Sequence, residues 1–117
     1  MVWTNFKQLI FKDKKYNNCI KQCLIILKRD PNNIDARKIL GDCYIKKDLL
    51  GKAIKEYENI FEYRSKNPEV VRTLAKLYKD TEQTYSAISV YNILSDLLTQ
   101  TDEIADVQAI LAELNEL

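Results

Sequence analysis

Apolar residues recur along this chain at the three- and four-residue spacing of amphipathic helices, in segments separated by short polar turns. The first two segments span residues 2–12 and 15–29, and a turn is predicted between them at Asp13 and Lys14. The residues expected on their apolar faces are Trp3, Phe6 and Ile10 in the first segment and Tyr16, Cys19, Ile20, Cys23, Ile26 and Leu27 in the second. The pattern therefore predicts an antiparallel pair of helices.

Five further helices are expected after this pair. They cover residues 34–46, the stretch from the turn at 48–51 to about 64, two segments between 68 and about 98, and about 102–117. The residues predicted to start helices are the N-caps Asn33, Asn67 and Thr101, with Pro68 in a first helical position. Only two glycines and two prolines occur in 117 residues, so the chain lacks the turns of an all-β protein. The predicted fold class is all-α.

The helical pattern repeats every 34 residues. Adding 34 takes Leu40 to Leu74, Tyr44 to Tyr78, Ala53 to Ala87, Ile54 to Ile88 and Tyr57 to Tyr91. Subtracting 34 from Leu40, Tyr44, Ala53 and Tyr57 reaches Phe6, Ile10, Cys19 and Cys23. A fixed period of this size is typical of helical repeat arrays, in which each copy buries its apolar face against a neighbour. We expect one domain, residues 1–117, with repeats at about 1–33, 34–67 and 68–101 and a capping helix at about 102–117.

These positions resemble the tetratricopeptide repeat (TPR) family, whose pattern is W-x2-L-G-x2-Y, then A-x3-F, then P. The matching residues are Leu40-Gly41-x2-Tyr44 and Ala53-x3-Tyr57 in the middle unit and Leu74-Ala75-x2-Tyr78 and Ala87-x3-Tyr91 in the third. The sequence departs from the pattern at four places: Lys7 replaces a small residue, Arg37 replaces the Trp, Pro68 comes three residues late, and no proline lies near Thr99. The resemblance implies a right-handed α-solenoid of three antiparallel helix pairs plus a seventh, capping helix. It also implies a concave groove, lined by the first helix of each pair, that commonly holds a peptide.

The net charge of +1 conceals a gradient along the chain. Residues 1–33 carry seven basic and two acidic side chains, whereas residues 102–117 carry five acidic and no basic ones. Because the two ends of the chain carry opposite charges, head-to-tail self-assembly of copies is an alternative function. A pI near 7.6 argues against a nucleic-acid-binding domain, although the basic N-terminal end leaves a nucleic-acid or membrane-surface adaptor as a lesser alternative.

The chain offers little for catalysis or metal binding. It has no His, no Gly-rich phosphate loop and no nucleophile with an identifiable base, so we expect no enzyme and no cofactor. Cys19, Cys23 and Cys43 fall on apolar positions and are expected to be buried thiols in a reducing compartment such as the cytoplasm. The longest apolar run, Cys23 to Leu27, is far shorter than the roughly 20 residues that cross a bilayer.

The candidate partner-binding residues lie on the first helix of each repeat, outside the apolar stripe. They are Gln8 and Phe11 in the first unit, Lys38, Asp42 and Ile45 in the second, and Arg72, Lys76 and Lys79 in the third. The three bases of the third unit share one helix face and favour an acidic or mixed peptide. In the family, a carboxylate clamp holds chaperone tails, but its positions here are Thr4, Gln8, Ile39, Glu69 and Thr73. None of these fits, which argues against that partner.

Two expectations concern the ends of the array. Trp3 is expected to be buried against the second helix, since it coincides with the family's aromatic residue. The repeat begins at residue 1 with no cap before it, which favours a segment cut from a longer protein. The final helix is expected to cover apolar surface near Tyr91 and Leu94, using Val107, Ile110, Leu111 and Leu114.

Overall fold

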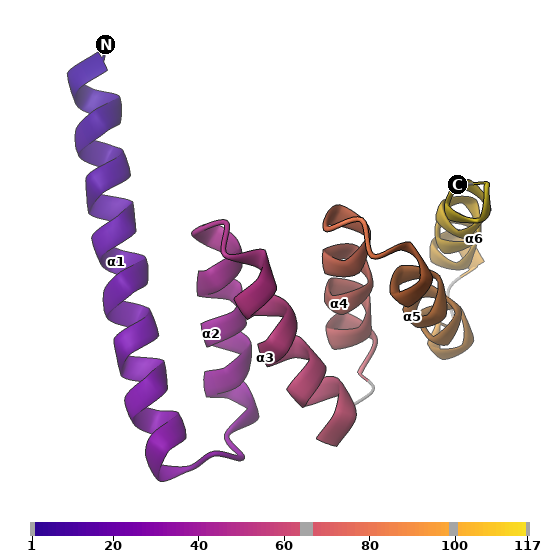
Figure 1. Cartoon of the computed structure of the whole chain (residues 1–117), viewed down its shortest axis with the longest axis horizontal. Helices are drawn as coiled ribbons and strands as arrows, with labels where there is room; N and C mark the ends of the chain where they lie inside the picture. The colour runs from indigo at the N-terminus through magenta and orange to yellow at the C-terminus, as the bar shows by residue number, and fades with distance from the viewer. Residues whose placement is uncertain (1, 64–66, 99–100, 117) are drawn as a thin grey trace. The chain divides into compact units, whose positions relative to one another are not determined.

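The structure, a computed structural model, describes the backbone of residues 2–63, 67–98 and 101–116, and the side chains of those ranges apart from residues 2–11 and 101. Within these ranges the chain forms six α-helices and no strand (Figure 1). They are α1 (Val2–Arg29), α2 (Ile34–Lys46), α3 (Leu50–Tyr63), α4 (Pro68–Asp80), α5 (Thr84–Leu97) and α6 (Thr101–Asn115). The predicted all-α class is confirmed. None of the helices described has the length and apolar content that a membrane span requires.

Helix α1 departs from the expected pair of helices. The turn predicted at Asp13 and Lys14 is wrong, because α1 runs unbroken for 28 residues, about 42 Å. This segment contains no Gly or Pro, and lysine favours the helical state. Lys47, in the loop after α2, also holds two residues one helical turn apart: its Nζ lies 3.2 Å from Asp13 Oδ1 and donates a hydrogen bond to Asn17. The first helix pair is therefore a single helix, and six helices replace the expected seven.

The turns that end α2 and α4 share one backbone conformation. Asp48 and Glu82, 34 residues apart, have φ angles of 58° and 60°. Equivalent hydrogen bonds close both turns. After α2, Leu49 N donates to Tyr44 O at 2.8 Å and Asp48 N donates to Ile45 O at 3.0 Å. After α4, Gln83 N donates to Tyr78 O at 2.9 Å and Glu82 N donates to Lys79 O at 3.1 Å. This pattern is the Schellman motif that commonly ends helices. Lys14 lies 34 residues before Asp48, and there the chain stays helical.

The chain divides into two compact units, residues 1–56 and 57–117, and α3 contributes to both. In the first unit α1 packs on α2, and in the second α4 packs on α5 and α5 on α6. The buried side chains of the first unit include Cys23, Ala36, Leu40, Cys43, Ala53 and Ile54. Those of the second include Tyr57, Ile60, Val70, Val71, Leu74, Ala75, Leu77, Ala87, Val90, Tyr91, Leu94, Val107 and Leu114. The apolar positions that define the repeat thus form the core of each unit.

Two of the expected N-caps are confirmed. Asn33 Oδ1 accepts a hydrogen bond from the Ala36 amide at 2.9 Å, and Asn67 Oδ1 accepts one from the Glu69 amide at 2.8 Å. Thr101 is instead the first helical residue of α6, and its side chain lies outside the described residues. The predicted burial of Trp3 concerns a side chain that also lies outside them.

Candidate partner-binding surface

The basic stripe predicted on the third repeat, residues 68–101, lies on α4 and is exposed. Arg72, Lys76 and Lys79 follow the i, i+4, i+7 spacing of one helix face, and all three are exposed. The residues of α4 that are buried instead are Val70, Val71, Leu74, Ala75 and Leu77. The apolar residues of α4 pack inside its unit, and the three basic side chains lie on its solvent-exposed side.

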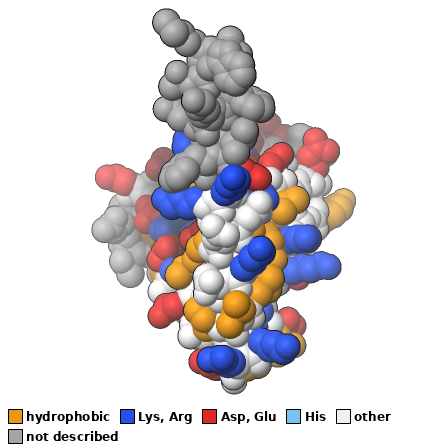
Figure 2. Space-filling view, turned by 90° about the vertical axis from the view of Figure 1, so that its left-hand side faces the viewer, with side chains coloured by type: hydrophobic (Ala, Val, Ile, Leu, Met, Phe, Trp, Pro, Cys, Tyr) orange, Lys and Arg blue, Asp and Glu red, His pale blue; other side chains and the backbone are white. Residues whose placement is uncertain are grey.

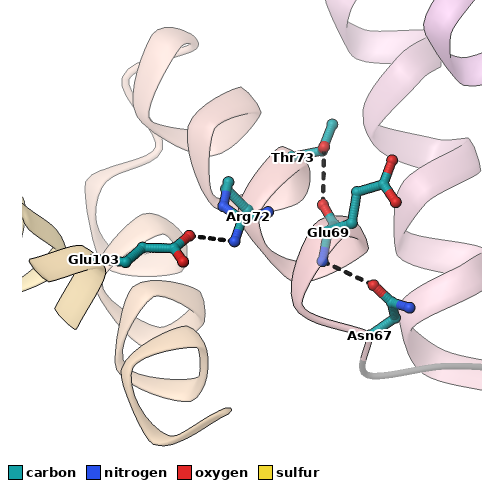
Figure 3. A network of polar contacts seen from close by, with 5 residues as sticks. All are labelled: Asn67, Glu69, Arg72, Thr73 and Glu103. Carbon is teal, nitrogen blue, oxygen red and sulfur yellow. Dashed lines mark hydrogen bonds and ion pairs between the residues drawn. The ribbon is translucent and has the colours of Figure 1, made fainter. Parts of the chain in front are cut away.

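One of the three bases already has an acidic neighbour. The Arg72 guanidinium pairs with the Glu103 carboxylate of α6, and Figure 3 shows the two side chains pointing toward one another. Both are partly solvated, with side chains 46% and 32% exposed, so the pair is screened by water and salt. Glu103 lowers the positive potential at Arg72, and the N-terminal end of the stripe is less basic than the Lys76–Lys79 end.

The candidate partner-binding residues on α2 differ in how far they are exposed. On α2, Asp42 is exposed, whereas Lys38 and Ile45 are half-buried. Gln8 and Phe11 belong to α1, and their side chains lie outside the described residues. The structure thus shows Asp42 on the surface of the first unit, while Ile45 is only partly available as an apolar contact.

Arg37, which replaces the Trp of the family pattern, has a structural role. Its guanidinium lies 3.0 Å from Glu56 Oε1 of α3 and donates to the Pro31 carbonyl oxygen at 2.6 Å. The side chains of Arg37 and Glu56 are only 18% and 14% exposed. One charged side chain therefore joins the linker before α2 to the middle of α3.

Two tyrosines of the repeat pattern lie at the edges of the cores. Lys52 Nζ lies 5.7 Å from the centre of the Tyr44 ring, within the range of a cation–π contact. Burial, followed by the charge of Glu58 and a hydrogen bond with it, raises the pKa of Tyr78 to about 12. Burial and the nearby Glu56 also raise the pKa of Tyr44. Both phenols are thus neutral at physiological pH.

The three cysteines gather where α1 packs on α2. Burial, with contributions from Cys19, raises the pKa of Cys23 to about 11 and that of Cys43 to about 12. Cys19 is half-buried, and none of the three thiols takes part in a disulfide. No group of His, Cys, Asp or Glu in the described part of the chain is arranged to hold a metal ion. Thiols of such high pKa are poor nucleophiles at neutral pH, which fits a packing role.

Sequence reasoning missed the apolar residues on the outside of α1. Ile26 was expected to face inward but is 43% exposed, while Leu24 and Ile25 are 49% and 51% exposed. The available signal was the run of apolar residues from Cys23 to Leu27, because five consecutive positions complete more than one full turn of a helix and apolar side chains must then lie on every side of it. Tyr85, at 90% exposure, is a second missed residue. It lines a shallow hollow of about 350 Å³ together with Tyr78, Ser86, Ser89 and Val90.

Comparison with known proteins identifies the fold. No protein-family model matches the sequence. The human DnaJ homolog subfamily C member 3 is 26% identical over 73 residues, which make up 62% of this chain and 14% of that protein. The crystal structure of MamA matches with a TM-score of 0.72 and 21% identity over 86% of this chain and 57% of that one. This chain thus spans a small part of the human protein and little more than half of MamA. Since MamA is built of TPR-like helical repeats, the chain has a TPR-like helical-repeat fold.

Proposed function

We propose that this chain is a non-catalytic scaffold that binds a peptide or protein partner with acidic character through the first-helix faces of its units. The observation that carries the proposal is the exposed stripe of Arg72, Lys76 and Lys79 on α4. A helix that buries its apolar side and displays same-sign charges on the other side attracts ligands of opposite charge. The TPR-like fold supports this reading, since repeat arrays present extended binding surfaces.

The candidate residues of this surface contribute different kinds of contact. Lys76 and Lys79 supply most of the attraction for an acidic segment, and Arg72 contributes once a partner carboxylate competes with Glu103. On α2, Lys38 and Asp42 are polar contacts and Ile45 is an apolar one, and on α1 Gln8 is a polar contact and Phe11 an apolar one. Exposed ion pairs contribute only about 0.2–1 kcal/mol each, so we expect micromolar affinity that weakens as salt rises.

Other classes of function are less well supported. Catalysis needs convergent groups in defined roles, and the titratable side chains of this chain do not supply them. Chaperone tails are a poor fit, because none of the carboxylate-clamp positions Thr4, Gln8, Ile39, Glu69 and Thr73 holds the Lys, Asn or Arg of that site. We also propose that the protein uses no cofactor, does not bind nucleic acid and works in a reducing compartment such as the cytoplasm. The free thiols of Cys19, Cys23 and Cys43 support the last point.

A peptide-array experiment tests the proposal. The full chain is applied to an immobilised library of random peptides, and bound peptides are compared with the library in their content of Asp and Glu. We expect binders enriched in acidic residues, with binding lost for Lys76→Glu combined with Lys79→Glu. These two substitutions leave the Arg72–Glu103 pair intact, so a change in the fold is not expected.

The matched control reverses the same number of charges elsewhere. Lys15 on α1 and Lys55 on α3 are both exposed, and the variant Lys15→Glu with Lys55→Glu has the same net charge as the test variant. If the control loses acidic peptides as strongly as the test variant does, the attraction comes from net charge and not from α4. Retention of every binder by the folded test variant would exclude the stripe as the binding site.

A further inference from the structure

The outer side of α1 combines basic and large apolar side chains. Lys14, Lys21 and Lys28 recur every seven residues, so they form one stripe along the helix, and all three are exposed. Leu24 and Ile25, each about half exposed, flank that stripe on its two sides. Figure 2 shows this side of the molecule, where hydrophobic and basic side chains lie next to one another. We refer to these five residues as the outer face of α1.

Among the described residues, nothing covers the apolar part of this face. Helix α1 packs on α2 through its opposite side, where Cys23 is 4% exposed. Large apolar side chains bordered by charges are typical of surfaces that bind another molecule. Because all three charges are positive, a matching surface needs acidic side chains beside small or apolar ones.

The exposed side of α6 has that composition. Helix α6 buries Val107 and Leu114 and packs on α5. Its exposed residues include the small side chains Ala105, Ala109 and Ala112 and the acids Asp102, Asp106 and Glu113, and the exposed acid Glu116 follows directly after the helix. The alanines follow i, i+4, i+7 spacing and thus form one stripe with the acids beside it. We refer to these seven residues as the outer face of α6.

The two outer faces match in length, charge and side-chain size. Lys14 to Lys28 covers 14 helical steps, about 21 Å, and Asp102 to Asn115, the last residue of α6, covers 13, about 20 Å. The large side chains Leu24 and Ile25 complement the low surface that alanines leave, and lysines on one face complement carboxylates on the other. We propose that the outer face of α1 binds the outer face of α6 of a second copy of this chain.

The interface is heterologous, because it joins two different surfaces. Each copy in a pair keeps one unused outer face, so copies add in a chain unless two copies close on each other. This interface uses none of the residues assigned to the acidic partner on α4. Self-association and partner binding can therefore be lost independently of one another.

Solution mass tests the interface directly. Light scattering of the full chain is recorded from about 10 μM to about 1 mM, the range in which weak contacts dissociate. We expect the average mass to rise with concentration and to fall when salt is added, because the attraction is partly ionic. A mass that stays at the 13.7 kDa of one chain over this range would overturn the proposal.

Charge reversal then locates the faces. One variant carries Lys21→Glu and Lys28→Glu, and a second carries Asp106→Lys and Glu113→Lys. Each alone should raise the dissociation constant at least about tenfold, since like charges then face each other. Mixing the two variants restores opposite charges at the contact, so the mixture should associate again. A mixture that stays monomeric while wild type associates would show that other surfaces make the contact.

Two further results separate this interface from other readings. Lys76→Glu with Lys79→Glu should leave self-association unchanged, and Lys21→Glu with Lys28→Glu should leave binding to acidic peptides unchanged. Vesicles with anionic lipid provide the remaining comparison, since a basic and apolar helix face also suits a membrane surface. Wild-type protein that stays monomeric but binds these vesicles through Lys21 and Lys28 would assign the outer face of α1 to lipid and overturn the proposal.

Discussion

Arg37 shows how one residue can replace the aromatic side chain expected at its position. A Trp would fill space there, whereas Arg37 joins the Pro31 carbonyl oxygen to the Glu56 carboxylate through charged hydrogen bonds. Arg37 and Glu56 are more than four-fifths buried, so water replaces a lost partner only in part. The position thus remains structural even though its chemistry has changed.

We expect Arg37→Ala to lower the free energy of unfolding by about 1–3 kcal/mol, because it leaves the Glu56 carboxylate without its partner. Urea unfolding of the single variants Arg37→Ala and Glu56→Ala and of the double variant measures the coupling between them. A coupling energy below about 0.5 kcal/mol would mean that the pair is only a surface contact.

Tyr78 gives the protein a dependence on alkaline pH. Its pKa in the folded state is about 12, above the ordinary value of 10, because the phenol is partly buried and lies beside Glu58. A raised pKa means that the folded state keeps its proton longer, so the contribution to stability is complete below about pH 10 and is lost as the pH rises toward 12. Unfolding by urea between these pH values should show falling stability, with a smaller fall for Tyr78→Phe. Tyr85→Phe, at a position 90% exposed, is the control and should follow wild type.

Among the helices, α3 has a glycine near its beginning that lowers the stability of the helix. Gly51 is the second residue of α3, has a negative φ, and a Cβ added there would meet no atom within 4 Å. Gly51→Ala should therefore raise the free energy of unfolding by about 0.5–1 kcal/mol, because alanine restricts the unfolded chain and favours the helix. Thermal unfolding followed by circular dichroism measures the gain. An unchanged or lower stability would show that the residue needs the freedom of glycine.

Helix α1 shows why a repeat pattern alone did not predict its length. The α2–α3 and α4–α5 turns each need one residue with positive φ, and Asp48 and Glu82 supply it. Lys14 stands at the same position of the period, but Lys47 binds Asp13 and Asn17 on the continuous helix. Lys47 is 30 positions from Asn17 and 34 from Asp13, so a local pattern does not reveal the contact.

For the whole molecule, the structure gives α6 the covering role expected of a last helix. Val107 and Leu114 are buried on the side that packs against α5, where Leu94 is also buried. Deleting residues 101–117 should expose this apolar surface, raise binding of a hydrophobic dye and lower the midpoint of thermal unfolding. Each of the two side chains contributes about 1.5–3 kcal/mol when fully buried. If the shortened chain binds no more dye and is equally stable, α6 contributes nothing to the core.

The helical class, the 34-residue period, two of the caps and most of the buried positions could be predicted from the amino-acid sequence. These features depend on local propensity and on apolar spacing, both of which can be read along the chain. The exposed bases Arg72, Lys76 and Lys79 were predictable for the same reason, because the side of a helix opposite its apolar stripe faces solvent.

Three features could be seen only in the folded chain: the first pair is one helix, Arg72 pairs with Glu103, and Leu24 and Ile25 stay exposed. Each depends on residues far apart in sequence or on the absence of a covering neighbour among the described residues. Apolar spacing shows which side chains can be buried, but burial itself requires a second surface within reach. For the outer face of α1 that surface is not among the described residues, and a second copy is our proposal for it.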